Sequence, residues 1–415
     1  MYEVIDGHLT DANVGARKHR SCRDNLFVLG AVSNSVINGQ SRPIQVQSMD
    51  IQKCFDKLWL EASINALYEA GLQHDLLNLL YIENENADIA VKVNNVLTDR
   101  FIVNKVVMQG SVWGGLKCTS SMDKLNKIMK KNETLMYRYR GDPNIGIGVL
   151  GMIDDNVGIS ECGTDSVVKN AIINSFVETQ ILEMHTDKSM VTHIGSANKC
   201  DQPCPNLQVH TNKMPEATNI KYLGNIITSK GGHRATIEER RNKGWGKVAT
   251  IMGILGEVEM GAHRMKVGLL LRKAILTSSL LFSAEAWSAV TDAELHRLEQ
   301  VDSSLLKSLA KGHSKTPVVF HHLETGTLKL RHILMKNRLL YHHHILTRED
   351  TETIKKIYYK QKEAQIKGDW LELVKKDFLF LGIEMNESEI KLTNKLEYKK
   401  KIKRLLYKAA FKGEG

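Results

Sequence analysis

The hydrophobic pattern of this chain changes near residue 235, and this change limits the folds that the chain can adopt. Before that point, short apolar segments alternate with polar residues, as in Ile44–Asp50, which is typical of a half-buried β-strand. After it, apolar residues recur at three- and four-residue steps, first over 237–258, where Thr236 is placed to cap a helix. The sequence therefore predicts an α+β region followed by a predominantly α-helical one.

Acidic residues stand where predicted strands end. Asp50 closes the first strand, and a helix is predicted from Lys53 onwards. Asp154 and Asp155 separate the apolar runs 149–153 and 157–159, which predicts a tight hairpin, and a second hairpin is predicted around the Asn pair at 94–95. Adjacent carboxylates repel each other, and a hard cation such as Mg²⁺ would relieve that repulsion. Taken singly, Asp50 is better explained as a solvated cap, and the acidic pair alone is only a weak sign of a metal site, because a solvated turn explains it as well.

Composition and charge narrow the class of protein. The formal net charge of +10 favours polyanionic partners such as nucleic acid. The six cysteines show no regular spacing, which predicts a reducing compartment rather than a disulfide framework. The N-terminus lacks the basic start of a signal peptide, and no stretch approaches the ~20 apolar residues of a membrane span. We therefore expect an intracellular protein that is not an integral membrane protein.

Four segments of the sequence are more informative together, in their order and spacing, than each is alone. The segment Asp50–Asp56 is followed by Val107–Ser111, by Met152–Asp155 and by Asn219–Gly224. In order and spacing these segments resemble motifs A, B, C and E of reverse transcriptases. Residues 14–21 and the C-terminal half resemble the corresponding parts of non-LTR (LINE-type) retrotransposon enzymes, so the resemblance covers nearly the whole chain.

The resemblance implies a right-hand polymerase. Partial fingers and a palm, an antiparallel sheet with helices on one face, would occupy 1–235, a helical thumb 236–315, and a basic helical extension 316–415. The implied activity is that of an RNA-directed DNA polymerase, which transfers a nucleotide from a dNTP to a primer 3′-hydroxyl with two Mg²⁺ or Mn²⁺ ions. RNA template, DNA primer or RNA–DNA hybrid, and dNTPs would be the partners. A retrotransposon ribonucleoprotein in cytoplasm and nucleus is the implied setting.

The resemblance also assigns roles to individual residues. Asp50, Asp154 and Asp155 would be the metal ligands. Lys188 would protonate the departing pyrophosphate, with an ordinary surface lysine as an equal alternative. Phe55 would be the steric gate under the incoming sugar, with a core aromatic as the alternative. The remaining candidates contact substrate or primer: Gln109 and Gly110 beside the incoming nucleotide, Arg17 and Arg20 in place of the triphosphate-gripping arginine, and Tyr222, Leu223 and Gly224 as the primer grip.

The chain departs from the family pattern in three ways. Met152 and Ile153 replace an aromatic and a small residue before the acidic pair, and Gly114 and Gly115 stand near the place of the common Ser-Pro. The chain begins after the point where the fingers motifs would lie, so we expect truncated fingers. Two other functions stay open for such a chain: a nucleic-acid-binding protein without catalysis, and a basic scaffold.

Several further features are open to more than one interpretation. Cys200, Cys204 and His210 approach zinc-ligand spacing without an evident fourth ligand, which favours ordinary loop cysteines. The run His342–His344 could bind a metal, but consecutive helix residues face different directions and cannot share one metal site, so a solvated, partly basic surface is favoured. The basic amphipathic helix over 397–411 favours nucleic-acid binding or docking on the thumb over a membrane surface. Trp245, among basic residues, is a candidate for duplex contact and equally for a core anchor.

Overall fold

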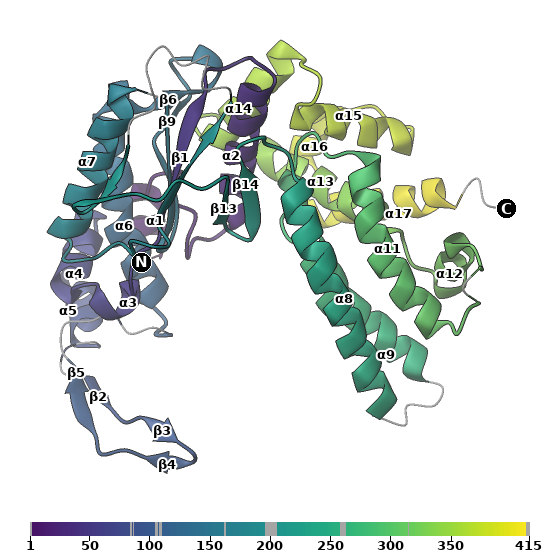
Figure 1. The fold of residues 1–415 in the computed structure, drawn as a ribbon, viewed down its shortest axis with the longest axis horizontal. Coiled ribbons are helices and arrows are strands. Elements are labelled where there is room, and N and C mark those ends of the chain that lie inside the picture. The colour runs from purple at the N-terminus through teal and green to yellow at the C-terminus, as the bar shows by residue number, and fades with distance from the viewer. Residues whose placement is uncertain are drawn as a thin grey trace. The chain divides into compact units, whose positions relative to one another are not determined.

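The computed structural model describes residues 2–83, 85, 87–103, 107, 110–161, 163–195, 206–257, 263–313 and 315–411. It divides into two compact units (Figure 1). The first comprises Met1–Asn25, Ser35–Leu223 and Thr228–Lys230, and the second comprises Leu26–Asn34, Gly224–Ile227 and Gly231–Gly415. None of the described helices is both long and apolar enough to span a bilayer.

A four-stranded antiparallel sheet forms the centre of the first unit, in the order β10 (Met190–Ile194), β1 (Ile44–Met49), β9 (Asp155–Glu161), β8 (Val149–Met152). The expectation of a half-buried β1 is wrong, since Gln45 and Gln47 are as buried as the apolar residues between them. The reason is position: β1 is hydrogen-bonded on both sides, and protein covers both of its faces, whereas alternation alone predicts one wet face.

Helices pack against this sheet and close the core of the first unit. Side chains of α6 (Gly114–Lys131) and α7 (Thr164–Thr179) meet those of the strands in one apolar cluster, which includes Met49, Met122 and Ile173. The helix predicted from Lys53 is interrupted, because Leu58 and Trp59 adopt extended backbone and separate α3 (Cys54–Lys57) from α4 (Leu60–Glu69). The unit also contains α1 (Tyr2–His8), the outer parts of α2 (Cys22–Ile37), α5 (His74–Ile82), β6 (Tyr137–Arg138), β7 (Gly146–Ile147), β11 (Gln208–Val209), β12 (Asn212–Lys213) and β13 (Asn219–Tyr222).

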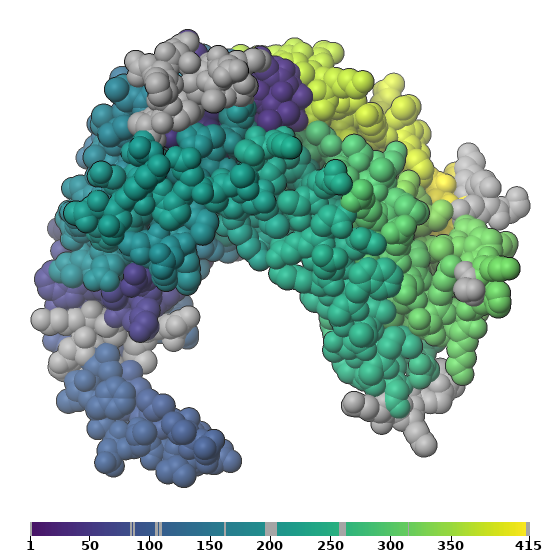
Figure 2. Space-filling view, in the orientation of Figure 1, coloured from purple at the N-terminus to yellow at the C-terminus, as the bar shows by residue number. Residues whose placement is uncertain are grey.

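A two-stranded ribbon stands away from the sheet and helices of its unit (Figure 2). It consists of β2 (Ala87–Ile89) paired with β5 (Phe101–Val103) and of β3 (Lys92–Val93) paired with β4 (Val96–Leu97). Asn94 and Asn95 both have positive φ, 48° and 67°, as a tight hairpin turn requires. The hairpin predicted from the Asn pair is confirmed.

The second unit is predominantly helical, as the three- and four-residue periodicity predicts. Its helices are α8 (Arg234–Glu257), α9 (Arg264–Leu271), α10 (Ser278–Leu280), α11 (Asp292–Leu309), α12 (Val318–Thr325), α13 (Leu330–Leu346), α14 (Thr353–Ala364), α15 (Trp370–Leu381), α16 (Glu387–Leu392) and α17 (Lys395–Ala410), and β14 (Asn225–Thr228) precedes them. A π-helical segment, Arg272–Thr277, joins α9 to α10. The prediction that Thr236 caps this helix is wrong, because α8 begins two residues earlier. The Thr236 hydroxyl instead accepts a hydrogen bond from the Ile226 amide at 2.8 Å.

The histidine run on α13 is a correction to the sequence analysis. His342, His343 and His344 are buried, not solvated, because α13 contacts α11, α14, α15, α16 and α17 and so has neighbours on every side. His342 Nε2 lies 3.0 Å from the Tyr358 hydroxyl, and His343 Nε2 donates to the Thr393 carbonyl at 2.8 Å. Helix α17 docks its apolar face on α13, with Ile402 and Leu406 fully buried.

Candidate active site

Strands β1 and β9 bring two of the predicted acidic residues together. In their antiparallel register Met49 lies opposite Asn156, so Asp50, one residue after β1, comes level with Asp155. Asp155 pairs with Met152 across the β8–β9 hairpin, which leaves Ile153 and Asp154 as its two-residue turn. The predicted hairpin at the acidic pair is therefore confirmed, and the sheet brings residue 50 to it.

The carboxylates at this edge affect one another. Asp155 is exposed, yet the pKa of its carboxyl is raised, first by the protein around it and then by the negative charges of Asp154 and Asp50. Lys188 forms an ion pair with Asp50, with its Nζ 3.8 Å from Asp50 Oδ2. Both partners of this pair are well exposed, so water screens their attraction.

The segment that carries Lys188 is fixed to Asp50 through the backbone. The His185 amide donates to the Asp50 carbonyl at 2.8 Å, and the Gln52 amide donates to the Glu183 carbonyl at 2.8 Å. The Asp50 amide donates to the hydroxyl of the buried Ser189 at 3.2 Å. These bonds hold the two segments side by side, although more than the whole of α6 and α7 separates them in the sequence.

The donor set fits a divalent cation by its chemistry. Carboxylate oxygens are the ligands that Mg²⁺ prefers, and the repulsion that raises the pKa of Asp155 is what a bound cation would relieve. Across the described ranges, no group of three or more His, Cys, Asp or Glu side chains is gathered closely enough to hold a metal ion. The assignment of Asp50, Asp154 and Asp155 as metal ligands thus stays a prediction.

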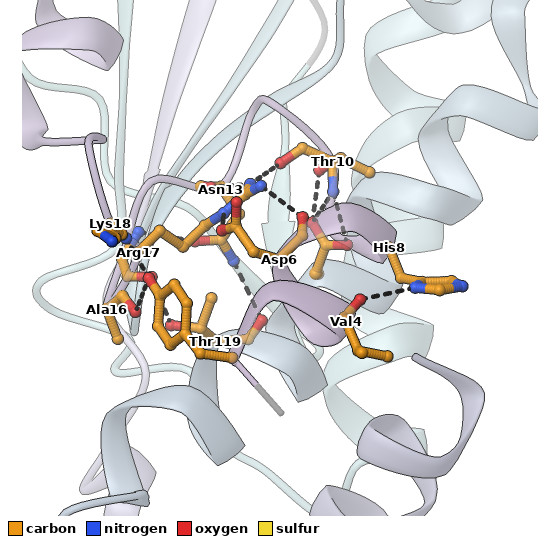
Figure 3. Close-up of polar contacts among 12 residues, drawn as sticks. Val4, Asp6, His8, Thr10, Asn13, Ala16, Arg17, Lys18 and Thr119 are labelled. Carbon is orange, nitrogen blue, oxygen red and sulfur yellow. Dashed lines mark hydrogen bonds and ion pairs between the residues drawn. The ribbon is translucent and has the colours of Figure 1, made fainter. Parts of the chain in front are cut away.

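Residues 12–15 support the acidic hairpin from the side. The Val14 amide donates to the Gly151 carbonyl, and the Gly151 amide donates to the Ala12 carbonyl, each at 2.9 Å. The buried Asn13 side chain donates to the Thr119 carbonyl at 3.2 Å and accepts from the Gly15 amide at 3.2 Å (Figure 3). This segment therefore links α6 to the strand that leads into the acidic pair.

Gly15 allows the segment 12–15 to lie very close to Ile153 in the acidic hairpin. A Cβ on Gly15 would lie 2.5 Å from the Ile153 amide nitrogen and 2.7 Å from Ile153 Cγ1. Ile153 has φ +60°, a strained conformation for a β-branched residue, at the turn position just before Asp154. Sequence reasoning assigned no role to Asn13 or Gly15, because an Asn and a Gly two residues apart are ordinary in any loop.

Arg17 is committed to its own segment. The buried guanidinium donates from Nε to Asp6 Oδ1 at 2.6 Å, from Nη2 to the Asp6 carbonyl, and from Nη1 to the carbonyls of Thr10 and Asn13 (Figure 3). It braces residues 6–13, and these contacts use the donors that a triphosphate would need. Arg20 lies with Lys18 and Met152 around a cavity of about 530 Å³ beside the hairpin.

The structure describes Phe55 and Gly110, but not every residue predicted to contact the substrate. Phe55 is half-buried and packs on the apolar core, which agrees with both alternatives for it. Gly110 has φ +89° and faces open space, while Gln109 lies outside the described residues. Cys200 and Cys204 also lie outside them.

The first residue of the predicted primer grip, Tyr222, is buried and its hydroxyl both donates and accepts a hydrogen bond. The buried Tyr222 hydroxyl donates to the Leu150 carbonyl at 3.0 Å and accepts from Asn25 Nδ2 at 3.1 Å. Asn25 Nδ2 also lies 2.9 Å from the Gly151 carbonyl, so both residues anchor on β8. Burial raises the pKa of Tyr222 far above its usual value. Leu223 and Gly224, with φ +45° and +73°, form the turn that follows.

The first long helix of the second unit exposes its tryptophan. Trp245 on α8 is 39% exposed, so it is not a core anchor. Its basic neighbours are partly neutralised, because Arg241 pairs with Glu238 and Lys243 pairs with Glu239. Arg240 is buried and lies over the Trp287 ring.

Comparisons with known proteins gave a family match and distant similarities to solved structures. No curated protein matches the chain. A structure of apo telomerase from Candida tropicalis is similar at 12% identity over 95% of this chain and 57% of that one, with a TM-score of 0.41. Telomerase from Candida albicans in complex with a fragment of telomeric RNA is similar at 10% identity over 79% of this chain and 56% of that one, with a TM-score of 0.39. The chain spans little more than half the length of these two proteins.

The match to a protein family covers the first unit almost completely. Residues 2–227 match the family described as reverse transcriptase (RNA-dependent DNA polymerase). The matched range contains the acidic hairpin, Asp50, Lys188 and the Tyr222 turn. The chain therefore belongs to the reverse transcriptase family.

Proposed function

We propose that this chain is the palm and thumb of an RNA-directed DNA polymerase of the LINE type. The observation that carries the proposal is the β1–β9 register, which brings Asp50 level with Asp155 beside Lys188. The family match supports the polymerase class, while the LINE subtype rests on the sequence resemblance of residues 14–21 and of the C-terminal half.

The proposed reaction removes the proton of the primer 3′-hydroxyl, which passes to water, joins O3′ to the α-phosphorus of a dNTP and breaks the bond from that phosphorus to pyrophosphate. Asp50, Asp154 and Asp155 would hold two divalent cations, which when bound neutralise charge on the attacking and leaving oxygens. Lys188 Nζ would give its proton to the departing pyrophosphate oxygen. Phe55 would bound the sugar, and the Leu223–Gly224 turn, anchored through Tyr222, would position the primer.

The proposed partners are an RNA template, a DNA primer or RNA–DNA hybrid, and dNTPs. The net charge of +10 and the exposed Trp245 on α8 support nucleic-acid binding. We place the protein in a ribonucleoprotein of cytoplasm and nucleus as part of the same proposal.

One observation favours a second candidate. Because no three metal-ligating side chains are gathered in the described ranges, a reverse-transcriptase fold that binds nucleic acid without catalysis is the alternative. It predicts salt-sensitive binding of template and primer with no nucleotide incorporation, even with Mn²⁺.

Primer extension on an RNA template with Mg²⁺ tests the first proposal. We expect the parent to extend the primer, and Asp154→Asn and Asp155→Asn to lose at least ~100-fold in rate. Asp99→Asn is the matched control, because Asp99 is exposed in the ribbon far from the site in sequence. Extension by the Asp154→Asn protein at the parent rate would refute the assignment.

A further inference from the structure

Four lysines of the second unit come from three separate elements and lie close enough to affect one another. Lys273 belongs to the π-helical segment Arg272–Thr277, Lys336 to α13, and Lys399 and Lys403 to α17. We call these four residues the lysine cluster. None of them belongs to α8 or to the palm residues proposed to carry the polymerase reaction.

Packing of the three elements brings the lysine cluster together. Arg272, next to Lys273, donates to the Leu328 carbonyl at 3.1 Å, two residues before α13 begins. Leu276 and Leu334 are buried in one apolar core, so the π-helical segment and α13 share that core. Helix α17 packs directly on α13.

The two lysines of α17 lie one helical turn apart, beside the buried face of that helix. Tyr398, Ile402 and Leu406 are buried, whereas Lys399 and Lys403 are exposed. Residues four positions apart on a helix are neighbours on the same side. Both lysines therefore border the junction of α17 with α13.

The positive charges of the lysine cluster are not offset by acidic neighbours. Lys336 is half-buried, and its pKa is lowered first by burial and then by the charges of Lys399, Lys273 and Lys403. Among the described residues none of the four forms an ion pair with a carboxylate, unlike Lys401, which is paired with a glutamate. An anion bound between these like charges would relieve their repulsion.

Aromatic rings border the lysine cluster. Lys403 Nζ lies 5.8 Å from the centre of the Tyr407 ring, and the ring of Phe411 lies 6.0 Å from that of Tyr407. The Tyr407 hydroxyl donates to the Gly326 carbonyl at 3.4 Å, which ties the ring to the chain before α13. Proteins that bind single strands combine such rings, on which bases stack, with basic side chains along the phosphates.

We propose that the lysine cluster binds the phosphate backbone of a nucleic-acid strand. Phosphates would lie between Lys336 and the exposed lysines, and Tyr407 would contact an adjacent sugar or base. The half-buried position of Lys336 favours a strand, whose phosphates protrude singly, over the flat surface of a bilayer. This contact with nucleic acid lies outside the palm and does not depend on catalysis.

Fluorescence anisotropy of the full chain with labelled oligouridylate, measured over a range of salt concentrations, tests the proposal. Each lysine that contacts a phosphate releases a counterion, so Lys399→Gln/Lys403→Gln should weaken binding and reduce the slope of log K against log salt by about 1.4, or about 0.7 for each contact. Lys375→Gln/Lys376→Gln is the matched control, because it removes the same charge from exposed positions on α15. We expect the slope of this control to equal that of the parent.

Lys336→Gln distinguishes a phosphate contact from a purely structural lysine. The substitution removes the repulsion by the neighbouring lysines, so it should raise the melting temperature while it weakens oligouridylate binding. A lower melting temperature together with an unchanged salt slope would overturn the site.

Lysine acetylation followed by mass spectrometry locates the bound strand. Oligouridylate should protect Lys336, Lys399 and Lys403 from acetylation and leave Lys375 reactive. The same protection should occur in Asp154→Asn, so that failure of the polymerase proposal leaves this result intact. Equal salt slopes for the cluster and control variants would contradict the proposal, as would protection of the cluster by phosphatidylserine vesicles but not by oligouridylate.

Discussion

Asp155 carries the electrostatic strain of the proposed active site. The protein around it partly displaces water from its carboxyl, and this effect, together with the charges of Asp154 and Asp50, raises its pKa, so the ionised hairpin is destabilised at neutral pH. Such strain is typical of sites prepared for a cation. The sequence could show the adjacent pair, and its hairpin could be predicted. The closeness of Asp50 could be inferred only through the family resemblance, because it depends on the strand register.

Removal of one carboxylate should therefore stabilise the metal-free protein. In EDTA at pH 8 we expect Asp154→Asn to raise the free energy of unfolding by about 0.2–1 kcal/mol, the range for partly exposed charges. The repulsion exists only while Asp155 is ionised, so the gain should shrink as the pH falls through the raised pKa of Asp155. Thermal unfolding across this pH range measures it.

If the three carboxylates bind Mg²⁺, the parent should become more stable than Asp154→Asn once Mg²⁺ is added. Mg²⁺ should stabilise the parent more than the variant, because a ligand that binds only the folded state adds to its stability. Asp99→Asn should behave like the parent throughout. An unchanged parent transition at millimolar Mg²⁺ would contradict the metal assignment.

Short segments, rather than long elements, determine where the acidic hairpin lies. Residues 12–15 pair with Gly151, and the Tyr222 and Asn25 side chains bond to the same strand. None of this could be predicted from the sequence, because each contact joins residues far apart in the chain without a periodic pattern. Arg17 shows the same limit: its charge predicts an anion partner, and its actual partners are Asp6 and nearby carbonyls.

Gly15→Ala tests the support of the hairpin. The new Cβ would lie 2.5 Å from the Ile153 nitrogen, so the turn before Asp154 must move. We expect kcat to fall about 10²-fold, as for ~1 Å misplacements of reacting groups, with KM for the primer–template little changed. Overpacking should also cost about 1–3 kcal/mol of stability.

Two comparisons identify the cause of that loss. Gly7→Ala, in α1 with no atom within 4 Å of the added Cβ, should retain parent activity. Weaker Mn²⁺ binding in Gly15→Ala, followed by electron paramagnetic resonance, would connect the loss to the acidic hairpin. Parent-like kcat in Gly15→Ala would show that residues 12–15 do not position the site.

At the scale of the whole molecule, the sequence predicts that an α+β region precedes a helical one, but it predicts less well which side chains are buried in each region. Periodicity identified the α+β region and the helical region, since amphipathic patterns are local. It misplaced the histidines of α13, because three consecutive polar residues suggest solvent when a helix has one wet face, and α13 has neighbours all around. Buried ionic groups escape pattern analysis for the same reason, as Arg338 and Asp377 show.

Each compact unit has its own apolar core, so we expect the chain to unfold in more than one step.

Arg338 and Asp377 form a buried ion pair with 3.0 Å between Nη1 and Oδ2, inside the second unit. Arg338→Met leaves the Asp377 carboxylate buried without its partner, which should destabilise that unit by about 3–5 kcal/mol. Calorimetry should show the transition of the second unit shifted down and that of the first unchanged. Arg100→Met, which breaks an exposed pair with Asp88 in the ribbon, should shift neither by more than about 1 °C. A single transition that moves as a whole in Arg338→Met would instead mean that the two units unfold as one cooperative body.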